Sequence, residues 1–333
     1  MEFKLHSARS NSRTSHRYCA TLIAGALAAR LLSVLVQLSI LLIFVSGCAH
    51  EGEKVVIYTS QDQVFAQPIL AKFTEHTGIR VATVYDSEAV KTVGLANRLL
   101  QERDHPQCDV FWSNEELRTR QLAARDVLRE TNGWTSFGFR SRRIVINTNL
   151  VPLNFAPKTI AGLTNGVWRG KVCLAYPLFG TTATHFLALR ELWGAPAWEN
   201  WCRALAANQP LLVDGNSVVV KQVARGEAAL GLTDSDDIAS GLEEGFPIVA
   251  LPMSDDMLLI PNTVAVIRHA PHPAAAERLF EYLQTKPVLD ALLKAHALEG
   301  AVPSKKSGLY PDWGNLLANL EPATTKLREI FLR

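Results

Sequence analysis

Cysteine is scarce in this sequence of 333 residues: there are only five, and none belongs to a CxxC pair or a Cys/His cluster. A zinc site is therefore not expected. Cys108, Cys173 and Cys202 are interpreted instead as small buried thiols. The sequence also lacks the G-x-S-x-G, H-E-x-x-H and P-loop motifs. This absence argues against an enzyme only weakly, because a catalytic triad can be assembled from distant residues.

An excess of charge of one sign is lacking as well, since the formal net charge is only +2. Residues 1–47 contribute +4, which leaves a weakly acidic balance of −2 for the rest of the chain. A nucleic-acid-binding protein would be expected to have a basic face, and nothing here suggests one. Internal repeats and low-complexity stretches are absent too. With 48% apolar residues, the chain is typical of a globular protein of two or three domains.

The N-terminal segment has the three parts of an export signal. A basic, serine-rich stretch leads into an apolar run from Leu31 to Val45, and small residues precede Cys48. The stretch from Val45 to Cys48 resembles a bacterial lipobox, in which the cysteine is lipidated and becomes the first mature residue. Residues 1–47 are therefore predicted to be a lipoprotein signal peptide. The alternative is a transmembrane anchor, which needs about 20 apolar residues, more than this run provides.

Strands and helices alternate after the signal. Short β-branched runs at 54–59, 79–85 and 109–112 predict strands, and amphipathic stretches at 64–77 and 89–102 predict helices between them. This spacing predicts a parallel sheet. Ligands bind beyond the carboxyl ends of such strands. Polar residues follow all three ends, at Thr59–Gln61, Tyr85–Glu88 and Ser113–Glu115.

A second α/β section follows, and its strand ends also lead into polar segments. Two such sections predict two lobes that face a cleft. Residues 48–142 with 258–304 are expected to form lobe 1, residues 143–257 lobe 2, and residues 305–333 a C-terminal helical segment. The strands expected at 142–147 and 258–267 are the candidates for crossing between the lobes. The other strands of this section are predicted at 171–175, 211–213 and 228–232, and the helices at 183–193, 197–207, 218–225, 272–283 and 287–296.

Seven polar blocks occur in an order that resembles one known family. They are Tyr58–Asp62, Val84–Glu88, Asp109–Glu115, Gly180–His185, Asp214–Ser217, Gly231–Asp237 and Ile260–Thr263. Together they resemble the family-1 extracellular solute-binding proteins, in the ferric-iron-binding branch, from about Val55 to Ser304. The resemblance implies a two-lobed periplasmic-binding-protein fold of type II. Each α/β lobe would have a mixed, mainly parallel sheet flanked by helices, and crossing hinge strands would join the lobes. An ABC permease and ATPase would be the partners.

One block departs from the ferric-binding pattern. Members of that branch place two adjacent tyrosines after the strand that here is predicted to end at Leu232, because phenolate oxygens are hard ligands for Fe³⁺. This sequence has Thr233–Asp237 there, with carboxylates and no tyrosine. Asp234 and Asp236 are predicted metal ligands only if the ligand is ferric iron, since carboxylates also bind hard cations. The same carboxylates would equally suit an ammonium group.

The candidate ligand site combines two anion cradles with this acidic segment. Gly180, Thr181 and Thr182 precede a predicted helix, whose free N–H groups and positive end can hold an oxyanion. The residues Thr59, Ser60 and Gln61 offer a second, facing cradle. The simpler interpretation of both is an ordinary helix cap. Further candidate ligand-binding residues follow other predicted strands: Tyr85, Glu88, Asn114, Tyr176, Asn216, Thr233, Asp234, Asp236 and Asn262.

The sequence therefore predicts a non-enzymatic substrate-binding lipoprotein of an ABC importer, anchored through Cys48 at the periplasmic face of a bacterial membrane. The predicted ligand is ferric iron with an anion, or a phosphonate- or phosphate-type oxyanion, and no cofactor is expected. Two alternatives are an exported hydrolase acting on a small anionic substrate and a ligand-presenting sensor subunit. Substrate turnover would identify the hydrolase. Neighbouring permease and ATPase genes would separate an importer from a sensor.

Overall fold

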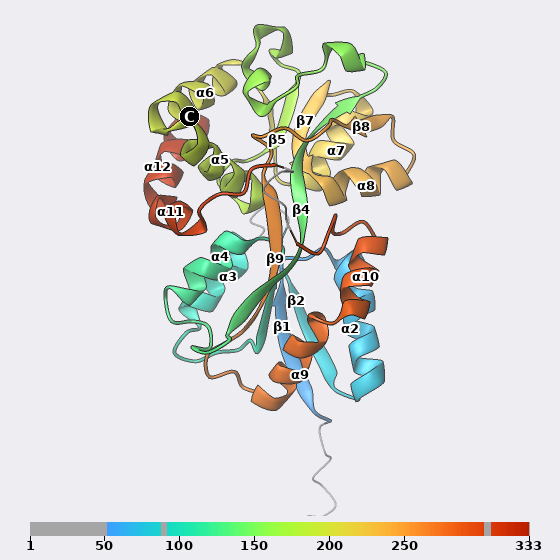
Figure 1. The fold of residues 1–333 in the computed structure, drawn as a ribbon, viewed down its shortest axis with the longest axis vertical. Helices are drawn as coiled ribbons and strands as arrows, with labels where there is room; N and C mark the ends of the chain where they lie inside the picture. Colours follow the sequence, from blue (N-terminus) through green and yellow to red (C-terminus); the bar gives the residue numbers. More distant parts are fainter. Residues whose placement is uncertain (1–51, 88–91, 303–307, 333) are drawn as a thin grey trace, which may run out of the picture. The chain divides into compact units, whose positions relative to one another are not determined.

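The computed structural model describes residues 52–87, 92–302 and 308–332. The predicted signal peptide, Cys48 and Glu88 lie outside these ranges. The described strands form a mixed sheet in the order β2-β1-β3-β9-β4-β7-β5-β6, and β8 pairs with β4. Figure 1 shows two groups of helices and strands connected by the long strands β4 and β9. No helix within the described ranges is long and apolar enough to cross a membrane.

Lobe 1 is the half that holds the first three strands. β1 (Lys54–Thr59) lies between β2 (Arg80–Tyr85) and β3 (Val110–Ser113) and pairs with both in parallel. Side chains of β1 alternate between the two faces, so each face buries an apolar cluster against helices. One face is covered by α2 (Gln63–Thr77), α9 (Pro273–Leu283) and α10 (Lys286–Lys294), and the other by α3 (Val93–Gln101) and α4 (Glu116–Ala123).

Two strands connect the halves. β4 (Trp134–Asn147) pairs antiparallel with β9 (Leu259–Val266) as far as Ser141, and from Arg142 onward it pairs with β7. A β-bulge interrupts the first pairing around Gly138, whose φ of 66° is left-handed. A Cβ atom there would lie 2.4 Å from Leu298 Cδ1, so a larger residue would not fit. β4 thus passes from one half of the molecule into the other between Ser141 and Arg142.

Lobe 2 is the half built on β5 (Val172–Ala175), β6 (Leu211–Val213), β7 (Leu230–Asp234) and β8 (Ile248–Ala250). β5 pairs in parallel with both β6 and β7. The 3₁₀ helices η2 (Leu153–Phe155), η3 (Ile160–Thr164) and η4 (Gly166–Trp168) follow β4. One face of the sheet is covered by α7 (Asn216–Arg225) and α8 (Ser235–Glu243), and the other by α5 (Gly180–Trp193), α6 (Ala195–Ala207), α11 (Trp313–Ala318) and α12 (Leu320–Phe331).

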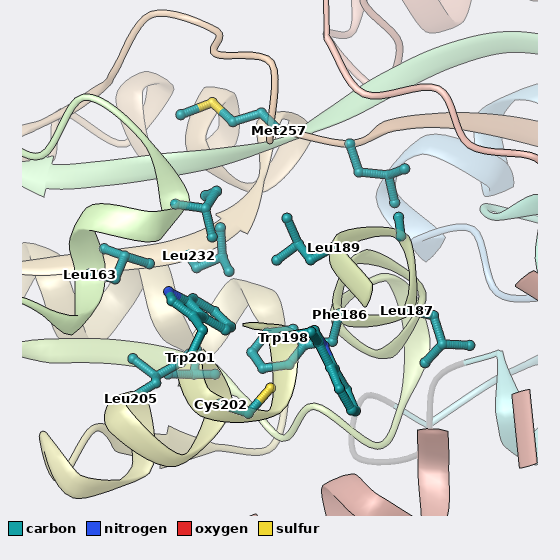
Figure 2. Close-up of a cluster of buried hydrophobic side chains, with 14 of the residues drawn as sticks. Leu163, Phe186, Leu187, Leu189, Trp198, Trp201, Cys202, Leu205, Leu232 and Met257 are labelled. Carbon is teal, nitrogen blue, oxygen red and sulfur yellow. The ribbon is translucent and has the colours of Figure 1, made fainter. Parts of the chain in front are cut away.

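Aromatic side chains of α5, α6 and α12 meet in the largest apolar cluster, which fixes α5 on lobe 2. Phe186 meets Trp201 with ring centroids 5.3 Å apart and meets Phe331 at 5.9 Å, both edge to face. Figure 2 shows Phe186, Trp198 and Trp201 packed in this cluster. Each fully buried side chain of this size contributes about 1.5–3 kcal/mol to folding. The cluster therefore holds the first turn of α5 in a fixed place, and that turn forms part of the site described below.

The predicted α/β two-lobed fold is confirmed, and Cys108, Cys173 and Cys202 are buried and free. Three local predictions were wrong. β4 begins at Trp134 rather than Arg142, because the bulge hides the alternating pattern of its first half. α5 and α7 begin at the residues that were expected to precede them. The polar segment Thr233–Asp237 lies in regular secondary structure, since β7 ends at Asp234 and α8 begins at Ser235. The lobe boundaries along the chain stay a prediction.

Candidate functional site

A pocket opens where β5 and β7 end beside the first turns of α5 and α7. Its cavity volume is about 20 Å³. That is room for about one water molecule. The residues around it come from both lobes and from β4: Thr92, Asn114, Arg140, Ala175, Tyr176, Phe179, Gly180, Thr181, Thr182, Asp214, Gly215, Asn216 and Asp234.

Two helices begin at this pocket. Gly180, Thr181 and Thr182 belong to the first turn of α5, and Asn216 is the first residue of α7. Neither helix has a side-chain hydrogen bond from its N-cap residue. The first N–H groups of a helix have no intrahelical acceptor, and the helix dipole is positive at this end. The pocket is thus lined by two helix ends that favour an anion.

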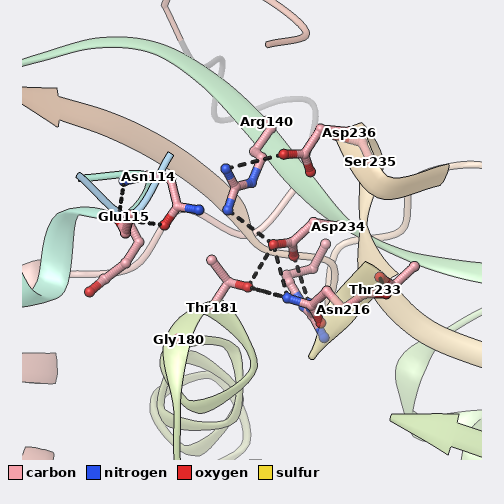
Figure 3. Close-up of polar contacts among 12 residues, drawn as sticks. Asn114, Glu115, Arg140, Gly180, Thr181, Asn216, Thr233, Asp234, Ser235 and Asp236 are labelled. Carbon is pink, nitrogen blue, oxygen red and sulfur yellow. Dashed lines mark hydrogen bonds and ion pairs between the residues drawn. The ribbon is translucent and has the colours of Figure 1, made fainter. Parts of the chain in front are cut away.

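Asp234 lies next to Thr181 and Asn216 at these helix ends (Figure 3), and it accepts four hydrogen bonds. Its Oδ1 accepts from Arg142 Nη1 at 2.6 Å, and its Oδ2 accepts from Thr181 Oγ1 at 2.7 Å. Oδ2 also accepts from Asn216 Nδ2 at 3.1 Å and from Arg140 Nη2 at 3.0 Å. Burial alone would raise the pKa of Asp234, but Arg142 and Arg140 outweigh it and hold that pKa below its ordinary value. Asp234 is therefore a buried carboxylate with full partners.

Arg140 lies between two carboxylates. Its Nη2 donates to Asp234, and its Nη1 forms an ion pair with Asp236 Oδ2 at 3.3 Å. Both Arg140 and Asp236 are only 2% exposed. Burial lowers the pKa of Arg140, but Asp236 and Asp234 outweigh burial and raise it overall. The guanidinium is permanently charged, so this part of the pocket contains a fixed cation.

Sequence reasoning missed Arg140 and Arg142. Both point inward from β4 and are 2% and 0% exposed. The one available signal was the recurrence of arginine at 140, 142 and 143 within a strand, since arginine is rarely buried without a partner. Their partners, Asp234 and Asp236, lie more than 90 residues away in the chain.

The anion cradle predicted at Thr59–Gln61 in lobe 1 does not line the pocket, and its side chains form hydrogen bonds within lobe 1 instead. Ser60 Oγ donates to Asn114 Oδ1 at 3.1 Å, and Thr92 Oγ1 donates to the same oxygen at 3.2 Å. Thr59 Oγ1 accepts from Gln61 N at 3.0 Å. Ser60 therefore positions Asn114, and Asn114 is the side chain of this group that reaches the pocket together with Thr92.

The structure brings about half of the predicted site residues together. Those that line the pocket are Asn114, Tyr176, Gly180, Thr181, Thr182, Asn216 and Asp234. Others are described but lie outside its lining: Thr59, Ser60, Gln61, Tyr85, Thr233, Asp236 and Asn262. Of these, Tyr85 packs against an apolar cluster of lobe 1, and Thr233 Oγ1 donates to Asn216 O at 2.9 Å. The lining residues that were not predicted as ligand-binding are Thr92, Arg140, Ala175, Phe179, Asp214 and Gly215. The ligand-binding role of every one of these residues stays a prediction.

The carboxylates have the spacing of a metal site but are already neutralised. One oxygen from each of Asp234, Asp236 and Asp237 lies within 4.8 Å of the others. Hard cations prefer such oxygen ligands. The charges of Asp234 and Asp236, however, are balanced by Arg140 and Arg142. Tyr176 brings a phenol to the pocket, but no pair of adjacent tyrosines follows β7. The residues therefore fit a tyrosine-based ferric site poorly.

Comparisons with known proteins find bacterial solute-binding proteins. A model of the family described as "Bacterial extracellular solute-binding protein" matches residues 54–296. The "Major ferric iron-binding protein" of Neisseria meningitidis is 24% identical over 200 residues, covering 54% of this chain and 58% of the relative. The "Fe(3+)-binding periplasmic protein" of Serratia marcescens is 27% identical over 210 residues, covering 58% and 60%. The chain thus spans less than two thirds of the length of these relatives.

Solved structures show the same fold. Iron-bound HitA from Pseudomonas aeruginosa is similar with a TM-score of 0.74 and 19% identity, over 84% of this chain and 99% of that one. AfuA from Actinobacillus pleuropneumoniae, with fructose-6-phosphate bound, is similar with a TM-score of 0.72 and 16% identity over the same shares. These matches confirm the predicted resemblance and the two-lobed fold.

Proposed function

Since this chain belongs to the bacterial extracellular solute-binding protein family, we propose that it captures a small oxyanion-bearing ligand between its lobes and delivers it to an ABC permease and ATPase. The ligand class we favour is a phosphate or phosphonate, free or as the head of a larger molecule. One observation carries this choice: the first turns of α5 and α7 and the guanidinium of Arg140 face the same pocket. All three favour negative charge.

The proposed binding mode uses backbone and side chains together. The N–H groups at Thr181, Thr182 and Asn216 would donate to the oxyanion, and Arg140 would supply the countercharge. Asn114 and Thr92 would close the site from lobe 1. A phosphoryl group is larger than the room for one water molecule that the pocket now offers. The proposed mode of ligand entry is therefore separation of the lobes about β4 and β9, a hinge motion of the kind typical of two-lobed binding proteins.

Ferric iron with an anion is the second candidate. Two observations favour it: the spacing of Asp234, Asp236 and Asp237, and the names of the ferric-binding relatives. We rank it second because Arg140 and Arg142 already balance the nearest carboxylates. The guanidinium would offset part of the carboxylates' attraction for a trivalent ion, by several kcal/mol even at a high effective dielectric constant.

A binding screen of the mature chain tests the ligand class. Inorganic phosphate, methylphosphonate, fructose 6-phosphate and ferric citrate would be compared by thermal shift and calorimetry, with fructose as the neutral control. A phosphorus oxyanion at a hundredfold excess over its Kd should stabilise the protein by about 2.7 kcal/mol. Stabilisation by ferric citrate alone would contradict the proposal. Release of phosphate from fructose 6-phosphate would point to the hydrolase instead.

The cellular setting is proposed on the sequence and on the relatives. We propose that residues 1–47 are removed on export and that a lipid on Cys48 anchors the protein at the periplasmic face of the membrane. Lobe 1 would comprise residues 48–142 and 258–304, lobe 2 residues 143–257, and the C-terminal helical segment residues 305–333. Cys48→Ala should move the protein from the membrane fraction to the soluble fraction. Unchanged fractionation would remove the lipid anchor from the proposal.

A further inference from the structure

Arg140 occupies the centre of a group of carboxylates that comes from both lobes. It lies on β4, where that strand passes from its pairing with β9 to its pairing with β7. The carboxylates of Asp234, Asp236 and Asp237 act on it from the end of β7 and the first turn of α8, and that of Asp62 acts from the residue before α2. The guanidinium is thus the shared countercharge of the carboxylates at the end of β7 and the start of α8.

The cluster itself has the dimensions of a cation site. An oxygen from each of Asp234, Asp236 and Asp237 lies within 4.8 Å of the other two. Oxygen ligands at about 2.0–2.6 Å from an ion lie up to about 5 Å apart across it, so the spacing suits a hard cation. Carboxylates this close repel one another when buried, and a countercharge is required to keep them ionised. Arg140 meets that requirement by its ion pairs with Asp234 and Asp236.

Arg140 also keeps one donor, Nε, that the cluster does not use. Its Nε and Nη1 atoms are buried, and among the described residues neither has a hydrogen-bond partner, although Nη1 is ion-paired with Asp236. The side chain is 2% exposed and lines the pocket beside the first turns of α5 and α7. Figure 3 shows the guanidinium between Asp236 and Asp234, on the side of the site where Asn114 approaches. The guanidinium thus balances the carboxylates while the same side chain lines the pocket.

We propose that Arg140 sets the ligand class of this site: it takes the place of a hard cation, excludes metal ions, and bridges the acidic cluster to an oxyanion in the pocket. The inference rests on the proposed oxyanion site for its last part only. The exclusion of metal follows from the carboxylates and the guanidinium alone. Removing the guanidinium should therefore convert an anion site into a cation site.

The test measures gain of metal binding by Arg140→Gln. Tb³⁺ is the probe, because it is a hard trivalent ion that binds carboxylates and is followed by calorimetry in phosphate-free buffer. Arg140→Gln should bind Tb³⁺ at least about 100-fold more tightly than wild type, since one unit charge at 4 Å changes affinity by more than this at an effective dielectric constant of 20. Arg140→Lys keeps the charge and is the matched control, which should bind Tb³⁺ no better than wild type.

A second variant and a second ligand distinguish the exclusion of metal ions from the binding of an oxyanion. Arg140→Gln combined with Asp236→Asn should lose the gained Tb³⁺ binding, which places the metal in this cluster. Inorganic phosphate is titrated in parallel. If wild type binds phosphate but Arg140→Gln gains no Tb³⁺ affinity, the exclusion role is overturned and the proposed function stands. If Arg140→Gln gains Tb³⁺ affinity while wild type binds no phosphorus oxyanion, the proposed function fails and the exclusion role stands.

Loss of folding in Arg140→Gln would still give an answer. A variant left with an unbalanced buried cluster would be refolded in the presence and absence of Tb³⁺ and followed by circular dichroism. Recovery of the native melting transition with Tb³⁺ supports the inference, because a ligand that binds only the folded state restores it by mass action. Failure to recover with Tb³⁺, while Arg140→Lys folds without it, would overturn the inference.

Discussion

Thr184 Oγ1 lies 3.3 Å from Glu115 Oε2, and this hydrogen bond joins α5 of lobe 2 to α4 of lobe 1. Glu115 is also the N-cap of α4, where its carboxylate accepts from Leu117 N at 2.7 Å and from Arg118 N at 3.0 Å. Burial raises the pKa of Glu115 above its ordinary value, although Arg118 and these hydrogen bonds oppose the rise. A buried carboxyl group of lobe 1 is thus in direct contact with lobe 2.

Removing the hydrogen bond between Thr184 and Glu115 should weaken ligand binding, although neither residue is proposed to contact the ligand. Thr184→Val deletes the interlobe hydrogen bond, which is worth about 0.5–1.5 kcal/mol, and so lowers the population of the closed arrangement. We expect phosphate affinity to fall by a factor of about 2–10, measured by calorimetry. Thr131→Val, at an exposed threonine of lobe 1, should leave affinity unchanged. Equal affinity for Thr184→Val and wild type would show that this contact does not bias closure.

The threonines at the start of α5 should differ in their effects. Thr181 Oγ1 donates to Asp234, whereas Thr182 Oγ1 donates to Asn216 Oδ1 at 3.3 Å. We expect Thr181→Val to weaken phosphate binding about tenfold and to cost about 1–3 kcal/mol in unfolding free energy, because a charge-assisted hydrogen bond is lost. Thr182→Val should weaken binding with a stability change below about 1 kcal/mol. Calorimetry gives the affinities and urea denaturation the stabilities. Unchanged affinity in both variants would argue against an oxyanion at this helix end.

Arg142 should be essential for stability. It is fully buried and donates to Asp234, to Asn216 Oδ1 at 2.8 Å and to Leu232 O at 3.1 Å. Arg142→Met leaves a buried carboxylate short of a partner, which costs about 3–5 kcal/mol. Arg203→Met removes an exposed pair with Glu199 at 2.7 Å and should cost at most about 1 kcal/mol. Urea denaturation of both variants checks this, and a similar cost for the two would contradict the structure of the network.

The free energy of unfolding should decrease as the pH drops below 6.5, because of His185. Burial, and then Arg142, lower its pKa from 6.5 to about 3, and its Nε2 lies 2.7 Å from Asp256 O. Between these two values the unfolded chain binds a proton that the folded chain does not. The contribution of His185 to stability is therefore present above pH 6.5 and is lost at up to about 1.4 kcal/mol per pH unit below it.

Variants separate the effect of His185 on the pH dependence of stability from the effect of the carboxyl groups. His185→Gln should show a shallower loss of unfolding free energy between pH 7 and pH 5 than wild type, measured by urea denaturation. His76→Gln, at an exposed histidine, should keep the wild-type slope. An identical slope for His185→Gln and wild type would mean that His185 is not held neutral in the folded protein.

Local patterns account for most of the secondary structure. The hydrophobic pattern at 54–59 fits only a buried strand, and the pattern at 64–77 fits only an amphipathic helix. β1 and α2 therefore lie within a residue of where they were expected. The failures have separate causes. The helices α5 and α7 begin at Gly180 and Asn216, residue types that are typical of turns, so the sequence predicts a turn there. The first half of β4 contains a bulge, which interrupts the alternating pattern of a strand.

The sequence by itself determined the alternating strands and helices, the two-section plan and the polar strand ends at which a pocket would form, because these depend on neighbours a few residues apart. Only the tertiary structure decided which charge dominates that pocket. Arg140 and Arg142 reach Asp234 across more than 90 residues of chain, and the strength of a buried ion pair depends on distance and on exclusion of water, neither of which a local pattern contains. An acidic segment that looked suited to a cation is, once folded, already balanced by arginine.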